Sequence, residues 1–142
     1  MTADGANTGA TGGCLCGAVR YRVAGPVRRA VVACHCTTCR RFTGGLWTGT
    51  SAWRADVVIE RDESLRWFRS SAEAERGFCS HCGSSLFWRG DNEPLMSLAV
   101  GCLDAPTGLE LAVHSWISEC ADYWRFDATL PRRPEWSGLA EP

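Results

Sequence analysis

The chain has 142 residues, of which 45% are hydrophobic and 22% charged, and this composition is typical of one globular domain with a packed core. Its formal net charge of −1 leaves no broad positive surface for nucleic acid or for an anionic membrane, so we expect neither partner. All fifteen basic residues are arginine, which excludes chemistry that needs a side-chain amine, such as Schiff-base formation.

The first twelve residues contain neither a basic cluster nor an apolar run, so we expect residues 1–12 to form a flexible tail and not a signal peptide or a membrane anchor. No stretch approaches the roughly 18–20 apolar residues that cross a bilayer. We therefore expect a cytoplasmic protein with a single domain over residues 13–136. The Pro-rich end of the chain is typical of irregular structure, with residues 137–142 as a second tail.

Alternating apolar and polar residues predict a half-buried strand over residues 14–23, in which Cys14 and Cys16 share one face. Further short apolar runs predict strands at 30–34, 46–53, 56–60, 65–69, 85–89, 95–100 and 113–118. No segment shows a helical stripe of ten residues, although TTCRRF after Cys36 allows one helical turn. The predicted fold is therefore mainly β, a small sandwich or barrel-like sheet.

Nine cysteines in 142 residues indicate either a disulfide framework or metal binding. The absence of an export signal and the clustering of cysteines at gaps of one and two residues favour metal binding. Cys102 and Cys120 stand alone, and we assign them no role because a solitary cysteine is most often a small buried hydrophobe.

Two of the cysteine motifs supply two thiols each. These are CLC at 14–16 and CSHC at 79–82, the second followed by Gly83, which relieves the left-handed backbone that such turns adopt. Two plus two thiolates make a closed tetrahedral site, for which zinc is well suited. We therefore predict a structural zinc that ties two distant parts of the chain together.

The middle motif, CHCTTC at 34–39, supplies three thiols within six residues. Structural zinc sites usually have four protein ligands, whereas catalytic sites keep three and leave a position for water or substrate. The three thiols therefore favour an open, catalytic zinc. Disulfide or redox chemistry at this motif remains an alternative.

A closed second site is another alternative, in which a histidine would complete the coordination. The three candidates are His35, His81 and His114. We expect His35 to be a neighbour of the metal ligands or a surface group, because an extended segment would turn its ring away from Cys34 and Cys36. We expect His81 to be exposed in its turn, and His114 to be packed in a strand.

The motifs GGCLCGAVRY, CHCTTCRRFTGG, RGFCSHCGSSLFW and AVGCLD, in this order, resemble the glutathione-dependent formaldehyde-activating enzyme family, which is shared with centromere protein V. The likeness spans residues from about Gly12 to Trp124. It implies a tent-like β fold with two zinc ions. It also implies a structural zinc held by Cys14, Cys16, Cys79 and Cys82 and a catalytic zinc held by Cys34, Cys36 and Cys39.

The same resemblance implies a carbon–sulfur lyase that joins glutathione to formaldehyde as S-hydroxymethylglutathione, with a small thiol and an aldehyde as substrates. Arg40 and Trp47 follow the catalytic motif and are candidate substrate contacts. We expect a zinc with three thiolates to act mainly by presenting a substrate thiolate. The alternative is a non-catalytic, zinc-stabilised binding module, and a homodimer is one possible assembly.

Overall fold

The computed structural model describes residues 8–28 and 30–136, which fold mainly as β-strands in two sheets. The strands are β1 (Thr11–Gly13), β2 (Arg20–Val23), β3 (Ala30–Cys34), β4 (Trp47–Trp53), β5 (Val57–Arg61), β6 (Leu65–Arg69), β7 (Ala74–Cys79), β8 (Ser85–Gly90), β9 (Leu95–Ala99) and β10 (Glu110–Ser115). The helices are α1 (Thr37–Thr43) and three 3-10 turns, η1 (Arg54–Asp56), η2 (Val100–Cys102) and η3 (Ile117–Glu119). Within the described ranges, no helix has the length and apolar character that crossing a membrane requires. The predicted mainly β fold class is confirmed.

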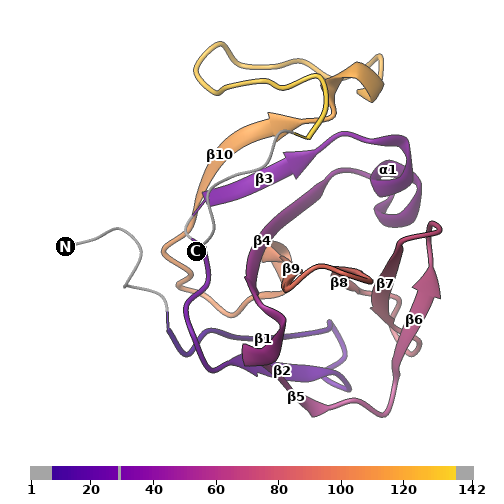
Figure 1. The fold of residues 1–142 in the computed structure, drawn as a ribbon, viewed down its shortest axis with the longest axis vertical. Coiled ribbons are helices and arrows are strands. Elements are labelled where there is room, and N and C mark those ends of the chain that lie inside the picture. The colour runs from indigo at the N-terminus through magenta and orange to yellow at the C-terminus, as the bar shows by residue number, and fades with distance from the viewer. Residues whose placement is uncertain (1–7, 29, 137–142) are drawn as a thin grey trace.

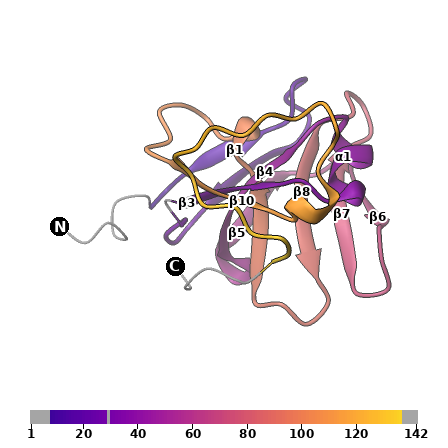
Figure 2. The same ribbon diagram turned by 90° about the horizontal axis from the view of Figure 1, so that it is seen from above.

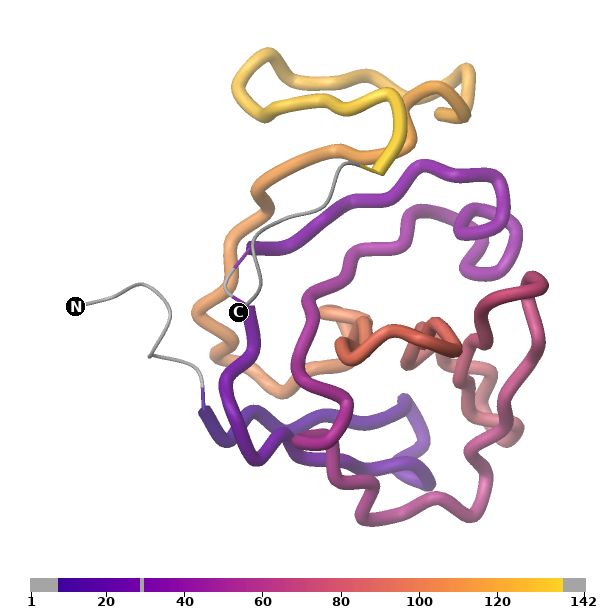
Figure 3. The backbone as a smooth tube through the Cα atoms, in the orientation of Figure 1, coloured from indigo at the N-terminus to yellow at the C-terminus, as the bar shows by residue number. Residues whose placement is uncertain are grey.

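The two sheets differ in size and share the chain unevenly. The small sheet has the order β1-β2-β5, and the large sheet has the order β10-β3-β4-β9-β8-β7-β6. All pairs are antiparallel except β10 with β3, which is parallel. Figure 1 shows the small sheet at the bottom and the large sheet curving from β10 and β3 at the top to the β6–β7 hairpin at the right. In Figure 3 the chain can be followed from β2 up to β3, through α1, down β4 and back to β5.

The main hydrophobic core lies between the small sheet and the middle strands of the large one. Tyr21 of β2 and Phe87 of β8 are fully buried there, with ring centroids 4.9 Å apart in an edge-to-face contact. Gly77 of β7 lets this core close, because a Cβ at that position would lie 3.0 Å from both Phe87 and Trp67. Other buried members are Val19, Val23, Val27, Ala52, Leu86, Met96, Leu98 and Leu103.

The C-terminal part of the described chain returns along β10. The backbone N–H of His114 donates to the carbonyl of Pro131 at 3.0 Å, and that of Ile117 donates to the carbonyl of Arg133 at 3.1 Å. Figure 2 shows this segment, coloured yellow, passing beside β10 and β3. The strand predicted over 113–118 is therefore displaced by three residues, because β10 spans Glu110–Ser115 and Trp116 adopts a left-handed backbone with φ 56°.

Three other sequence predictions need correction. Residues 14–19 form a turn instead of the first half of a strand, since β1 ends at Gly13 and β2 begins at Arg20. Strand β7 was not predicted at all. The described part of the expected tail 1–12 is held in place, because Thr11 and Gly12 belong to β1 and Thr8 pairs with Pro26. The rest of that tail, the tail at 137–142 and the end of the domain lie at or beyond the limits of the described residues, so those boundaries stay predictions.

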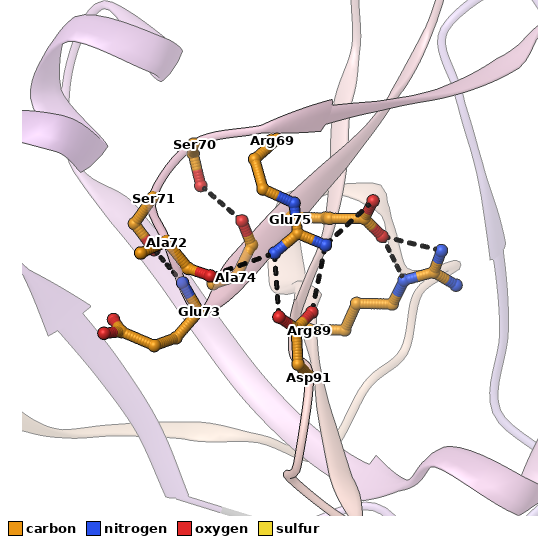
Figure 4. A network of polar contacts seen from close by, with 9 residues as sticks. All are labelled: Arg69, Ser70, Ser71, Ala72, Glu73, Ala74, Glu75, Arg89 and Asp91. Atoms are coloured by element: carbon orange, nitrogen blue, oxygen red, sulfur yellow. Dashed lines mark hydrogen bonds and ion pairs between the residues drawn. The ribbon is translucent and has the colours of Figure 1, made fainter.

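A network of ion pairs joins β6, β7 and β8 on the face shown in Figure 4. Arg69 binds Asp91 through both terminal nitrogens at 2.9 and 3.1 Å, and Arg89 binds Glu75 at 2.8 and 3.0 Å. The guanidinium of Arg89 also lies 3.5 Å from the centre of the Trp67 ring. Because these groups are partly exposed, each ion pair of the network contributes little to net stability.

A second polar contact fixes the start of the described chain. Asp104, in the loop after η2, accepts a hydrogen bond of 2.6 Å from the Thr11 hydroxyl and a two-pronged bond from Arg20. The Arg20 guanidinium, followed by the Thr11 hydroxyl, lowers the pKa of Asp104 to about 2. Since the carboxyl is ionised more readily in the folded chain, this contact stabilises the fold above about pH 4 and loses its effect as the pH falls towards 2.

We expect Asp104→Asn to lower the free energy of unfolding at pH 7 by less than about 1 kcal/mol, because exposed ion pairs are largely screened. The difference from the unaltered protein should shrink as the pH falls from 4 to 2. Urea unfolding at several pH values measures it, with Asp62→Asn, an exposed carboxylate in another loop, as the control. A difference that does not change with pH would contradict a role for the Asp104 charge.

Candidate metal centre

The four cysteines of the first and third motifs meet in space. The Sγ atoms of Cys14, Cys16, Cys79 and Cys82 all lie within 4.8 Å of one another, and we call them the four-cysteine group. The Cys14 and Cys16 sulfurs are 3.6 Å apart, and those of Cys16 and Cys79 are 3.8 Å apart. A tetrahedral zinc with Zn–S bonds of about 2.3 Å separates its sulfurs by about 3.8 Å. The spacing therefore fits a metal with four thiolate ligands.

The turn between β1 and β2 presents the first two sulfurs. The backbone N–H of Cys14 donates to the carbonyl of Val19 at 3.1 Å, and the N–H of Gly17 donates to the carbonyl of Cys14 at 3.2 Å. Gly17 has a φ of 82°, which a residue with a side chain rarely adopts. The turn brings Cys14 and Cys16 together in place of the shared strand face that the sequence predicted.

The turn between β7 and β8 presents the other two sulfurs. Gly83, with a φ of 80°, donates its N–H to the carbonyl of Cys79 at 2.8 Å, as expected for a CxxCG turn. Hydroxyls surround the sulfurs: that of Ser64 lies 3.1 Å from Cys79 Sγ and that of Ser84 lies 3.2 Å from Cys82 Sγ. Hydrogen bonds from the Ser84 side chain and backbone lower the pKa of Cys82 to about 5, which favours the thiolate that a metal requires.

The middle motif forms a second, local group. The Sγ atoms of Cys34, Cys36 and Cys39 also lie within 4.8 Å of one another, and we call them the three-cysteine group. Cys34 ends β3, Cys36 caps the N-terminus of α1 in an extended conformation, and Cys39 lies in its first turn. The Cys36 sulfur accepts a hydrogen bond of 3.3 Å from the Cys39 N–H. The single predicted helical turn is therefore a seven-residue helix that orients the thiols.

Contacts among these three sulfurs set their acidity. Hydrogen bonds from the thiols of Cys34 and then Cys39 lower the pKa of Cys36 strongly, whereas the same contacts with Cys34 and Cys36 raise the pKa of Cys39. One of the three cysteines therefore ionises readily. Its negative charge then disfavours ionisation of the other two thiols unless a cation is present. Three sulfurs held this close together suit a divalent metal with a preference for thiolates.

Apolar and aromatic side chains wall the three-cysteine group. Buried Cys39 packs with Trp47 of β4, Ala99 and the partly buried Trp88 and Cys102. Trp47 is held by a hydrogen bond of 3.1 Å from its ring N–H to the Ser97 hydroxyl. Trp47 thus lies beside the group, as its position in the sequence suggested, and its contact with a substrate stays a prediction.

Arg40, the other candidate contact, lies on α1 next to Cys39. Its Nη2 atom is 3.5 Å from the Thr37 hydroxyl on the same helix. A role for Arg40 in substrate binding also stays a prediction. Cys102 borders both the main core and the wall of the three-cysteine group, whereas Cys120 belongs to neither metal-binding group.

Arg76 of β7 is the neighbour that the sequence analysis missed. It is only 4% exposed, and its Nη2 atom donates to Cys39 Sγ at 3.4 Å. The guanidinium lies 5.6 Å from the centre of the Phe42 ring. Its Nε and Nη1 atoms are buried without a hydrogen-bond partner. The available signal was its position three residues before Cys79, which places it in the strand that leads to the CxxC turn.

The histidines do not join either group. The four-cysteine and three-cysteine groups contain no histidine nitrogen, although all three histidines are among the described residues. His35 is fully buried, so of the two alternatives expected for it the surface position is wrong, and its Nε2 lies 2.8 Å from Nδ1 of His114. Trp124 and Phe126 cover this pair, each with its ring centroid 5.1 Å from that of His35. His114 is packed and His81 exposed, as expected.

An aromatic cavity of about 390 Å³ lies on the α1 side of the β6–β7 hairpin. Its lining residues are Phe42, Phe68, Phe78, Gly83 and Ser85. Phe42 joins this cavity to the three-cysteine group, because it also packs against Arg76. The cavity could receive an apolar part of a small ligand.

The chain is similar in sequence to known proteins of one family. Residues 9–119 match the sequence pattern of the family described as glutathione-dependent formaldehyde-activating enzyme. A Halomonas elongata protein that carries the name of this family is 32% identical over 131 residues. The match covers 87% of this chain and 69% of the relative. A Schizosaccharomyces pombe protein named as an uncharacterised lyase is 32% identical over 77 residues, and the match spans 54% of this chain and about half (55%) of that relative.

A solved structure shows the same fold. The crystal structure of a Rhodobacter sphaeroides protein superposes with a TM-score of 0.56 at 26% identity, covering 67% of this chain and 88% of that one. The family pattern covers most of the chain and includes all seven clustered cysteines. The chain therefore belongs to the glutathione-dependent formaldehyde-activating enzyme family.

Proposed function

We propose that this protein is a zinc-dependent carbon–sulfur lyase that joins a small thiol, such as glutathione, to formaldehyde or another small carbonyl compound. The observation that supports it most is the pairing of a four-cysteine group with a three-cysteine group in one small domain. The first offers a complete tetrahedral set of protein ligands, and the second offers a set with one position to spare. The relatives named as a lyase and as a formaldehyde-activating enzyme agree with this chemistry.

The geometry of the two cysteine groups supports an assignment of ligands. We propose that Cys14, Cys16, Cys79 and Cys82 hold a structural zinc and that Cys34, Cys36 and Cys39 hold the catalytic one. Zinc fits because it prefers tetrahedral thiolate coordination and does not change its redox state. When bound, the catalytic zinc would keep a substrate thiol ionised and nucleophilic near neutral pH.

The chain's own residues would arrange the reaction. The sulfur of the substrate adds to the carbonyl carbon, a carbon–sulfur bond forms, and the proton of the thiol ends on the new hydroxyl oxygen, so that no oxidant is needed. Trp47 and Trp88 would keep water away from the reacting atoms, because they wall the three-cysteine group. Arg40 and Trp47 are the candidate residues for holding the substrate.

Metal content separates the two groups. The unaltered protein should bind two zinc ions per chain, Cys36→Ser should bind one and stay folded, and Cys120→Ser, the control, should bind two. Cys82→Ser should unfold or aggregate, because a structural zinc contributes about 10 kcal/mol or more, which is comparable with the stability of a whole domain. Elemental analysis and thermal unfolding measure both effects. A Cys36→Ser protein that keeps two ions would contradict the ligand assignment.

Turnover tests the reaction itself. Glutathione and formaldehyde exchange with their adduct, and NMR measures the rate of this exchange. The rate should be higher with the zinc-loaded protein than in buffer alone. Cys36→Ser should lower the enzymatic rate at least about 100-fold, because the position that accepts the thiolate is lost. Cys120→Ser should keep the rate. Equal rates with and without the unaltered protein, for glutathione and for other small thiols, would favour a non-catalytic binding module.

A further inference from the structure

Arg76 is a buried positive charge that lacks a carboxylate partner. No Asp or Glu oxygen of the described residues lies within 4.0 Å of its guanidinium. Glu75, its neighbour in β7, binds Arg69 and Arg89 in the network described above. With Nε and Nη1 also without partners, Arg76 has only the Cys39 sulfur and the Phe42 ring to offset its charge.

A guanidinium in this position is costly unless a negative charge lies beside it. Burial of an unpaired ion costs several kcal/mol, and an aromatic ring returns only a fraction of that. The Cys39 sulfur is in direct contact at 3.4 Å, and Cys34 and Cys36 belong to the same group. A net negative charge on the three-cysteine group, such as three thiolates around a divalent cation have, would offset this cost.

We propose that Arg76 is the counter-ion of the three-cysteine group and a positioning residue. Its positive charge lets the metal-loaded group, which is already anionic, accept the thiolate of a small thiol substrate. This inference rests on the proposed function. Three thiolates around a zinc ion have a formal charge of −1, and a fourth thiolate makes it −2. The guanidinium reduces the total to −1, so the incoming thiolate meets much less repulsion than it would without Arg76.

The wall of the site strengthens this effect. Trp47 and Ala99 are buried against Cys39, and the guanidinium lies over the Phe42 ring, so water screens the charges on this side of the group only in part. A charge at about 6 Å in such a partly buried setting changes the affinity for a unit anion by about 10- to 100-fold. The affinity for a neutral ligand would change very little, so a charge effect can be distinguished from a packing effect.

The test compares an anionic with a neutral ligand at one metal. Cobalt-substituted protein is titrated with 2-mercaptoethanol and, separately, with imidazole, and binding is read from the visible absorption bands. Arg76→Gln should weaken binding of the thiol by about 10- to 100-fold and change that of imidazole by less than about threefold. Arg76→Lys, which keeps the charge, should recover most of the affinity for the thiol. The control is Arg89→Gln, which removes a positive charge from neighbouring β8 and should have no effect.

Each other outcome has a definite meaning. Equal thiol affinity in Arg76→Gln and the unaltered protein overturns the inference but leaves the proposed function standing. A parallel loss for thiol and imidazole also overturns it, because that result indicates a packing defect. If no thiol changes the spectrum of the unaltered protein, the proposed function fails together with the inference. If Arg76→Gln cannot hold cobalt at this centre, retention by Arg76→Lys supports the charge role, and loss from both variants overturns it.

Discussion

The approach of Cys14 and Cys16 to Cys79 and Cys82 is the contact on which the rest of the structure depends. It joins the β1–β2 turn of the small sheet to the β7–β8 turn of the large sheet, and Cys16 and Cys79 are 63 positions apart in the sequence. The main core lies between these sheets, and Cys14 and Cys79 are themselves buried members of it. A domain this small has limited apolar surface to bury, so a metal at this junction would add stability where the two sheets must stay in register.

The same junction also reaches the second cysteine group through β7. Arg76 and Cys79 are three residues apart on this strand, so whatever anchors the CxxC turn also anchors the guanidinium beside Cys39. The three-cysteine group is local to β3 and α1, and its thiols need no distant partner to meet. Its charge environment, by contrast, comes from the far hairpin. The four-cysteine group and the three-cysteine group are therefore connected through strand β7 even though they share no residue.

The sequence predicted most of the cysteine geometry because the relevant contacts are local or have fixed spacing. CHCTTC brings three sulfurs together over six residues, from the end of β3 to the first turn of α1. The CxxCG turn closes by its own backbone hydrogen bonds. Strand β6 was predicted with its correct bounds, Leu65–Arg69. Counting two thiols from each outer motif already paired these motifs before the family resemblance implied the same pairing, and their four sulfurs do meet in space.

The failures arise where tertiary contacts overrule local pattern. Strand β7 does not alternate, since Arg76 and Gly77 are both buried and the register with β8 shifts after Gly77. Gly77 accommodates the Trp67 and Phe87 rings on one side, and Arg76 faces the cysteines on the other. The surface alternative for His35 failed for a similar reason, because two of the residues that pack on it, Trp124 and Phe126, lie about ninety positions further along the chain. No local window contains such information.

Arg76 and His35 are both ionisable side chains buried in the protein, and each meets the cost of that burial in a different way. Both lie next to thiols of the three-cysteine group and both are removed from water, but His35 has a hydrogen-bond partner in His114, whereas Arg76 has only the Cys39 sulfur and the Phe42 ring. A histidine pair can discard its proton, and burial lowers the pKa of His35 accordingly. Arginine cannot discard its proton, so its charge must be matched by its surroundings. The permanent positive charge of Arg76 beside the three-cysteine group therefore favours negative over positive charge in any ligand that the group binds.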